Sequence, residues 1–325
     1  MVKLCIKCGL EGHTNRACKG PVTSFGLIVF VKGKKNLQKG RIYPHQITLC
    51  PIHNKDGNNQ NSPLLVRKDS VYNEILFLLV ERKDTVGFLN IVQGSYPELE
   101  PYKSKKVNRY LSELTCEERE KLVVWDFQRL WKVAGSDKKD MAKAETKFKS
   151  LNIQSLIDNS NCLYEEADYL MPKGRLKYGE STKQCALREF SEETGYNKTD
   201  VQLLDVAPYS EQFTGTDGKT YRNVFYVARL KEDAEISTRL GDDPNQTKEV
   251  RNLGWFNLTE CNELIRDYHQ DKKDILALVH ALLLQNMSPY NAESTNFDPK
   301  GWNSRWRPTA YRFMRDVTPI DTTHI

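Results

Sequence analysis

The stretch from Gly174 to Tyr196, GRLKYGESTKQCALREFSEETGY, constrains the fold of this chain more than any other part of it. Ser181 can cap the first amides of a helix, and Gln184 three residues later completes a capping box. The helix is predicted over Thr182 to Thr194, and Gly195 suits the left-handed residue that ends many helices. The pattern therefore predicts a turn that leads into one well-delimited helix.

Three carboxylates share one face of this predicted helix. Glu189, Glu192 and Glu193 stand at i, i+3 and i+4, so they lie close together and repel one another. A hard divalent cation with oxygen ligands would offset that repulsion. A solvated, glutamate-rich surface helix is the alternative.

The spacing extends beyond the helix. The pattern G-x5-E-x7-R-E-x-x-E-E-x-G is filled at every fixed position, by Gly174, Glu180, Arg188, Glu189, Glu192, Glu193 and Gly195. Seven specified residues match by chance at roughly one in ten million per start site at ordinary composition. That figure decides against the plain surface helix.

This pattern is the Nudix box, and the chain resembles the Nudix hydrolases. The resemblance implies an α/β fold, an α/β/α sandwich with a mixed sheet, and metal-assisted attack of water on a diphosphate linked to another group. It also implies Mg²⁺ or Mn²⁺ ligands at Glu189, Glu192 and Glu193. Arg188 would orient them, and Glu180 would be a helix-stabilising carboxylate.

Other residues are candidates for the chemistry of such a site. Lys173 and Arg175 flank Gly174 and could contact phosphates. A general base must lie within hydrogen-bond reach of the attacking water. Glu249, expected on a strand, is the first candidate and Glu193 the second, although Glu249 could equally be an edge-strand charge. The aromatic candidates for stacking on a nucleobase of the substrate are Tyr96, Phe213, Tyr221 and Tyr226.

A closer resemblance covers roughly residues 23 to 285. The order of LFLLVERKDTVGFLNIVQGSY, PKGR, REFSEETGY and ILALVHALLL is similar to that of the mRNA-decapping Nudix enzymes of poxviruses and other large DNA viruses. It implies capped mRNA as substrate and m7GDP as product. Hydrolysis of nucleoside diphosphate derivatives or diphosphoinositol polyphosphates is one alternative, because PKG also precedes the box in diphosphoinositol polyphosphatases. A non-catalytic RNA-binding regulator is another, against which the intact glutamates argue.

The N-terminus carries a second motif, with the spacing of a CCHC zinc knuckle. Three thiolates and one imidazole complete a closed tetrahedral Zn²⁺ site, and the metal would supply the folding free energy. The ligands would be Cys5, Cys8, His13 and Cys18. Chance clustering is the alternative. Knuckles resemble single-strand RNA binders, while protein docking is a second possible role. Side chains that could contribute are Lys3, Lys7, Leu10, Arg16 and Lys19.

The remaining pattern divides the chain. We expect a zinc knuckle over residues 1–20, a Nudix domain over 21–287 with a helical insertion at about 102–156, and a basic aromatic tail over 288–325. Core strands are predicted at 23–31, 75–81, 205–213 and 221–230, the last two as a hairpin. One helix is predicted from a cap at Thr115 through Trp131.

Composition narrows the setting. A formal net charge of +5 is compatible with a polyanionic partner. No secretory signal or membrane span is expected. Eight cysteines without such a signal indicate a reducing compartment, where metal binding is expected over disulfides. For a viral protein this would be the cytoplasm of an infected host cell, or the virion.

Overall fold

The computed structural model describes residues 4–32, 74–137, 139–215, 218–234, 240 and 246–286. The tail expected over 288–325 lies outside the described residues. None of the helices in the described part combines the length and the apolar character that crossing a membrane requires.

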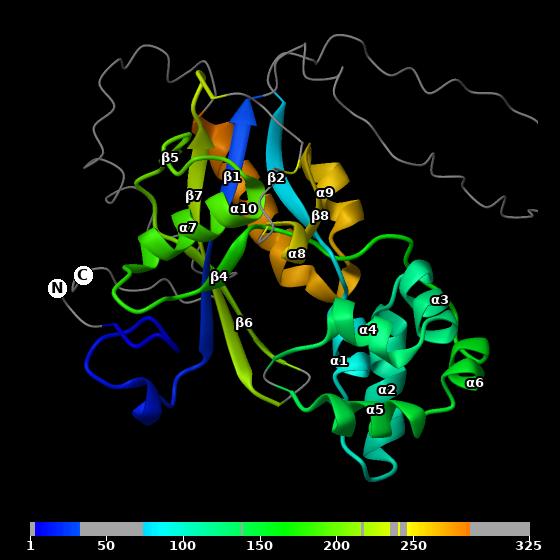
Figure 1. The fold of residues 1–325 in the computed structure, drawn as a ribbon. Helices are drawn as coiled ribbons and strands as arrows, with labels where there is room; N and C mark the ends of the chain where they lie inside the picture. Colours follow the sequence, from blue (N-terminus) through cyan, green and yellow to red (C-terminus); the bar gives the residue numbers. More distant parts are fainter. Residues whose placement is uncertain are drawn as a thin grey trace, which may run out of the picture.

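A mixed sheet forms the centre of the molecule (Figure 1). Its order along the main path is β3-β2-β1-β7-β5, with β4 paired to β1, β6 to β7 and β8 to β2. β1 and β7 run parallel, and the remaining pairs are antiparallel. The described strands are β1 (Val22–Lys32), β2 (Ile75–Arg82), β3 (Tyr169–Leu170), β4 (Lys173–Arg175), β5 (Val201–Leu203), β6 (Tyr209–Thr214), β7 (Thr220–Leu230) and β8 (Val250–Phe256).

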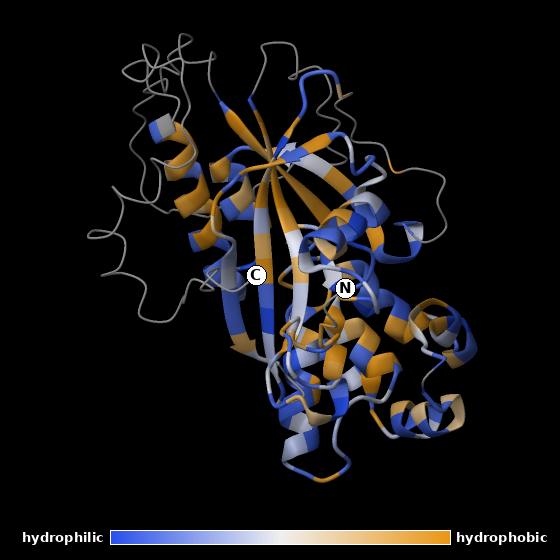
Figure 2. Cartoon of the chain, turned by 90° about the vertical axis from the view of Figure 1, so that its left-hand side faces the viewer, coloured by the Kyte–Doolittle hydropathy of each residue, from blue (hydrophilic) through white to orange (hydrophobic). Residues whose placement is uncertain are grey.

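Both faces of this sheet are covered, which explains why β1 is almost continuously apolar. Leu27 and Val29 pack on one side with α7 (Thr182–Thr194), whereas Ile28 and Phe30 pack on the other. The second side is covered by α9 (Leu258–Leu264) and α10 (Gln270–Asn286). The apolar strands lie between these layers in Figure 2. The expected α/β/α sandwich is confirmed.

A separate group of helices lies between β2 and β3 in the sequence and beside the sheet in space (Figure 1). We call it the helical body. Its helices are α1 (Val86–Val92), α2 (Tyr102–Glu113), α3 (Cys116–Val124), α4 (Phe127–Ala134), α5 (Met141–Lys149) and α6 (Ile153–Asp158). They share an apolar core of their own, with Phe88, Tyr110 and Leu130 at its centre.

The helix predicted from Thr115 through Trp131 is wrong in one respect, because the structure breaks it into α3 and α4. Its start is confirmed, since Thr115 and Glu118 form a capping box. Trp125 then adopts an extended backbone conformation, and the Asp126 side chain accepts a hydrogen bond from the Arg129 amide to begin α4. A second N-cap therefore ends the first helix.

Glu118 also connects two helices. Its carboxylate is fully buried and accepts hydrogen bonds from the Thr85 amide at 2.7 Å, the Thr85 hydroxyl at 2.8 Å and the Thr115 amide at 3.0 Å. Thr85 and Thr115 are the N-caps of α1 and α3. One carboxylate therefore lies at the positive ends of both helices.

The cysteine expectation needs a correction. Cys116 and Cys162 form a disulfide, although the sequence favoured metal binding over disulfides. The two ends of the α3–α6 segment lie side by side, because the Cys116 amide donates to the Tyr164 carbonyl and Thr115 bridges to Tyr164. The backbone pairing of residues 115–116 with Tyr164 thus brings the two sulfurs together.

Two further boundaries differ from the prediction. The strand expected from residue 205 begins only at Tyr209, as β6, and forms the predicted hairpin with β7. Glu249 was expected on a strand, but it ends the short helix α8 (Gln246–Glu249), directly before β8. The Glu249 carbonyl accepts a hydrogen bond from the Lys83 amide, which orients α8 against the end of β2.

Candidate active site and zinc site

The local sequence of α7 determines where it starts and stops. Ser181 accepts a hydrogen bond from the Gln184 amide, and the Gln184 side chain accepts one from the Ser181 amide. Gly195 ends the helix in the left-handed region with φ of 77°. Phe190 and Thr194 are buried beneath it. The predicted helix over Thr182–Thr194 is confirmed residue for residue.

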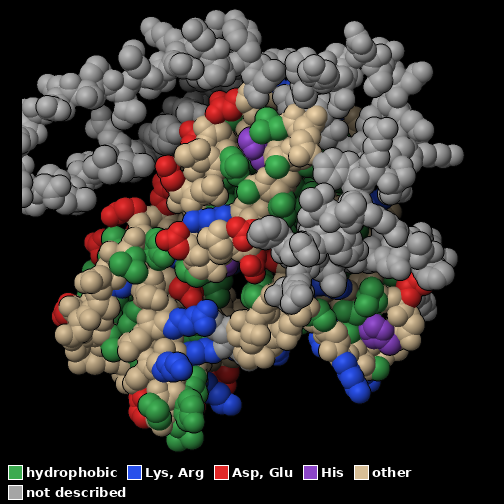
Figure 3. Space-filling model, turned by 180° about the vertical axis from the view of Figure 1, so that it is seen from behind, with side chains coloured by type: hydrophobic (Ala, Val, Ile, Leu, Met, Phe, Trp, Pro, Cys, Tyr) green, Lys and Arg blue, Asp and Glu red, His purple; other side chains and the backbone are tan. Residues whose placement is uncertain are grey.

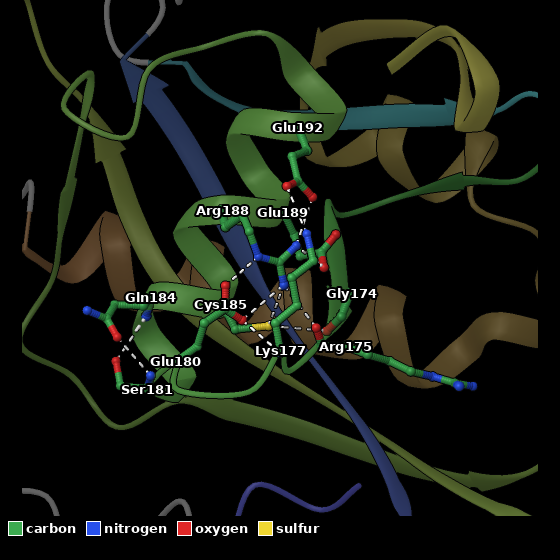
Figure 4. A network of polar contacts seen from close by, with 10 residues as sticks. All are labelled: Gly174, Arg175, Lys177, Glu180, Ser181, Gln184, Cys185, Arg188, Glu189 and Glu192. Atoms are coloured by element: carbon green, nitrogen blue, oxygen red, sulfur yellow. Dashed lines mark hydrogen bonds and ion pairs between the residues drawn. The ribbon is translucent and has the colours of Figure 1, made fainter. Parts of the chain in front are cut away.

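Arg188 lies at the centre of the glutamate cluster (Figure 4). Its Nε contacts the Glu180 carboxylate at 2.5 Å, and its Nη1 contacts Glu189 at 2.6 Å and Glu192 at 2.8 Å. Its Nη2 donates to the Arg175 carbonyl at 2.9 Å. The hydrogen bond from Arg188 lowers the pKa of Glu180. The guanidinium thus holds three carboxylates in place and offsets part of their repulsion.

Gly174 is required where β4 passes under α7. A Cβ on this residue would lie 2.1 Å from the Glu189 Cδ and 2.3 Å from each of its carboxylate oxygens. Any larger residue would displace that carboxylate. The spacing between Gly174 and Glu189 in the motif therefore has a steric cause.

A pocket of about 200 Å³ opens beside α7. It brings together the predicted glutamates of the helix and Glu249 from α8, which lie far apart in the sequence. Its lining residues are Lys177, Arg188, Glu189, Glu192, Glu193, Gln246 and Glu249. Glu249 is exposed on its rim, and in the described part of the chain no ion pair involves its carboxylate.

The sequence missed two lining residues. Lys177 donates a hydrogen bond to Glu192 at 3.1 Å, and Gln246 donates to the Glu193 carbonyl at 3.1 Å. Lys177 lies inside the motif and could have been found as the basic residue between Gly174 and Glu180. Gln246 carried no signal, because only the fold brings it against the end of α7.

The two predicted phosphate contacts differ in their surroundings. Lys173 is half-buried, its amide donates to Glu193 at 3.2 Å, and its side chain lies in the field of Glu193 and Glu211. Burial raises the pKa of Glu193 to about 8, and the charge of Lys173 acts in the opposite direction. Arg175 is exposed, and its side chain extends away from the cluster (Figure 4). Only Arg175 is free to reach outward.

The donor set of the pocket fits a hard divalent cation. Four carboxylates face it, and the missing Cβ of Gly174 leaves the space that Glu189 occupies. The glutamate oxygens lie against Arg188, Lys177 and Lys173 in this arrangement.

The N-terminal quartet fits Zn²⁺. Its ligand atoms all lie within 4.8 Å of one another, and no other such group occurs in the part of the chain that the structure describes. The members are Cys5, Cys8, His13 and Cys18. All three cysteines are buried, and the donor set of three sulfurs and one imidazole is that of a closed structural site.

The part of the chain that contains the motif also matches a protein-family model. Residues 157–279 match the NUDIX domain model. The chain carries a Nudix domain. The motif is filled at every position, and α7 is the helix of this Nudix domain.

Relatives match over more than the Nudix domain. A protein of Acanthamoeba polyphaga mimivirus named "Putative mRNA-decapping protein" is 28% identical, over 90% of this chain and 97% of that protein. The mRNA-decapping protein g5R of African swine fever virus is 24% identical, over 59% of this chain and 82% of its own length. The Ap4A hydrolase of C. elegans aligns over 81% of this chain and 99% of its own, with 12% identity and a TM-score of 0.36.

The aromatic candidates of the Nudix domain have three different environments. Tyr96 is buried in the helical body, with the Lys147 ammonium over its ring. Tyr226 shares a hydrogen bond with Thr182 at 2.7 Å. Phe213 and Tyr221 stack on each other on the β6–β7 hairpin, with ring centroids 5.7 Å apart, and Phe213 is exposed.

Proposed function

We propose that this Nudix hydrolase is a metal-dependent pyrophosphohydrolase that removes the 5′ cap of mRNA and releases m7GDP. The observation that carries the proposal is the match to the mimivirus relative, which spans nearly the whole of both chains and bears the name of a decapping protein. The glutamate-lined pocket supplies a suitable site. The formal net charge of +5 suits an RNA partner.

The residues of the Nudix helix would hold Mg²⁺ or Mn²⁺ through Glu189, Glu192 and Glu193. Such an ion, when bound, neutralises phosphate charge and acidifies the water bound to it. Arg188 would keep Glu189 and Glu192 oriented through the contacts that it already makes with them. Glu180 would act indirectly by holding Arg188 in place, since it binds the other edge of the same guanidinium.

Glu249 is our first candidate for the general base, and Glu193 is the second. Glu249 faces the pocket from α8, and the Lys83 amide holds its backbone carbonyl. A base must reach the proton that it abstracts, and an exposed carboxylate on the pocket rim can do so. Substituting Glu249 would then lower kcat and leave cation affinity nearly unchanged, whereas substituting Glu193 would lower both.

Phosphate binding would fall to exposed cations around the pocket. Arg175 extends outward from the strand that begins the motif, and Lys177 lines the pocket itself. Lys173 is half-buried beside Glu193, so it would be the less accessible of the two predicted phosphate contacts. Seen from behind, Lys and Arg side chains also gather on the helical body near the centre of the molecule (Figure 3). Such a surface favours a polyanionic substrate.

Each part of the chain would have its own role in this activity. We propose a zinc knuckle over residues 1–20 that contacts RNA, a Nudix domain over 21–287 with its helical insertion, and a tail over 288–325. The viral relatives support action within an infected cell.

Incubation with Mn²⁺ or Mg²⁺ and cap-labelled RNA tests the proposal. We expect labelled m7GDP from the wild-type protein and none above background from a Glu192→Gln, Glu193→Gln double variant. Glu263→Gln, on the exposed face of α9, is the matched control and should behave as wild type. A parallel screen includes dinucleoside polyphosphates and inositol pyrophosphates. Turnover of those compounds alone would replace decapping with small-molecule hydrolysis, and tight RNA binding without turnover would indicate a regulator.

A further inference from the structure

Arg222, on β7, is a half-buried cation without a carboxylate partner among the described residues. Its Nη2 donates to the Cys8 carbonyl at 3.2 Å, and its Nε is buried without a hydrogen-bond partner in the part of the chain that the structure describes. An uncompensated cation in such a place is costly, so a negative charge is expected next to it.

The zinc site supplies that charge. Three thiolates and a neutral imidazole around Zn²⁺ leave a net charge of about −1, and the three cysteines are buried. Outer groups that face metal ligands commonly orient and stabilise them. We propose that Arg222 is the outer partner of the zinc site, and that it makes the zinc-loaded knuckle an integral part of the Nudix sheet.

Other contacts hold the knuckle against the same sheet. The Thr23 amide at the start of β1 donates to the Lys7 carbonyl at 2.7 Å. A Cβ on Gly9 would lie 2.4 Å from Cζ of Phe25, so the knuckle backbone lies directly on that ring. Leu4 packs against the core cluster to which Phe25 belongs.

The docking brings the zinc loop close to the active-site motif. Phe25 pairs across the sheet with Gly174, the glycine that makes room for Glu189. A knuckle that lost its metal would uncover Phe25 and release the start of β1. A knuckle tethered only by the chain would bind zinc without regard to Arg222. A knuckle docked on the sheet through Arg222 should therefore lose zinc faster when Arg222 is substituted, whereas a knuckle tethered only by the chain should not.

Zinc release from the full chain to a chromogenic chelator separates these arrangements. We expect Arg222→Met to release zinc roughly 10- to 100-fold faster than wild type, the range typical of lost outer-shell partners, and Arg222→Lys to lie between them. Arg229→Met is the control, because Arg229 lies on the same strand but pairs with Glu232. Release from Arg222→Met at the wild-type rate would overturn the proposal.

Thermal unfolding provides a second measurement, in case Arg222→Met folds poorly. Zinc removal should lower the Tm of the wild-type chain. Arg222→Met should lower Tm in the zinc-loaded state and have little effect in the zinc-free state, because the charge that it compensates is then absent. An equal loss of Tm with and without zinc would make Arg222 a packing residue and contradict the proposal. Neither measurement uses RNA, so both stand apart from the test of decapping.

Discussion

At the scale of single residues, Gly174 shows how an absent side chain shapes the site. A Cβ there would fall within 2.3 Å of the Glu189 carboxylate oxygens. We expect Gly174→Ala to fold, to move Glu189, and to lose about a hundred-fold in kcat, the cost of displacing a catalytic group by about 1 Å. Cap hydrolysis under saturating Mn²⁺ measures this. Gly179→Asn, at a glycine with φ of 84° and open space around it, should keep its activity.

Arg188 provides a residue-scale test of stability. Its side chain is only 10% exposed and contacts three carboxylates. Arg188→Met would leave these carboxylates close together without their common cation, at a cost of about 3 kcal/mol in the free energy of unfolding. Urea denaturation of Arg188→Met, Glu180→Gln and the double variant gives the coupling between the two residues. If Arg188 and Glu180 stabilise each other, the double variant should lose less free energy of unfolding than the two single variants lose together. A larger loss in the double variant than that sum would contradict a stabilising pair.

At the scale of elements, Glu118 joins α1 to α3. Glu118→Ala would leave the Thr85 amide, the Thr85 hydroxyl and the Thr115 amide buried without their acceptor. We expect a loss of about 3 kcal/mol in the free energy of unfolding, and a smaller loss for Glu118→Gln, which retains one acceptor oxygen. Hydrogen exchange should rise first in α1 and α3. Exchange that changes only in α7 would refute this coupling.

Elements with local signals were the ones that the sequence predicted. The capping boxes at Ser181 and Thr115 gave correct helix starts, and Gly195 gave a correct stop, because each signal lies within a few residues of its effect. The break at Trp125 was missed because apolar periodicity continues across it. The place of Gln246 beside α7 depends on contacts between distant segments, which periodicity does not encode.

At the scale of the whole molecule, Asp168 lies where the sheet, the helical body and the start of α10 meet. Tyr268 donates to its carboxylate at 2.7 Å, and Arg266 also contacts the helical body through the Glu113 carbonyl. Burial raises the pKa of Asp168, but the interaction with His269, whose Nε2 lies 3.6 Å from the carboxylate, and the charge of Arg266 lower it to about 2. This junction therefore depends on an ionised carboxylate.

The pH dependence of stability follows from that shift. The pKa of Asp168 is lower in the folded state than the ordinary value of 3.8, so its contribution is present above pH 4 and is lost as pH falls towards 2. The contribution is about 2 kcal/mol. Urea midpoints between pH 5 and pH 2 should fall more steeply for wild type than for Asp168→Asn. If the urea midpoints of wild type and Asp168→Asn fell equally steeply with pH, Asp168 would not be the source of the pH dependence.

The proposed activity of the whole molecule depends on the glutamates of the Nudix helix binding a divalent cation. Titration of the zinc-loaded full chain with Mn²⁺, followed by electron paramagnetic resonance, tests it most directly. We predict saturable Mn²⁺ binding by wild type and by the Glu263→Gln control. A Glu189→Gln, Glu192→Gln, Glu193→Gln variant that still folds should show none over the same concentrations. Equal binding by that variant would contradict the claim.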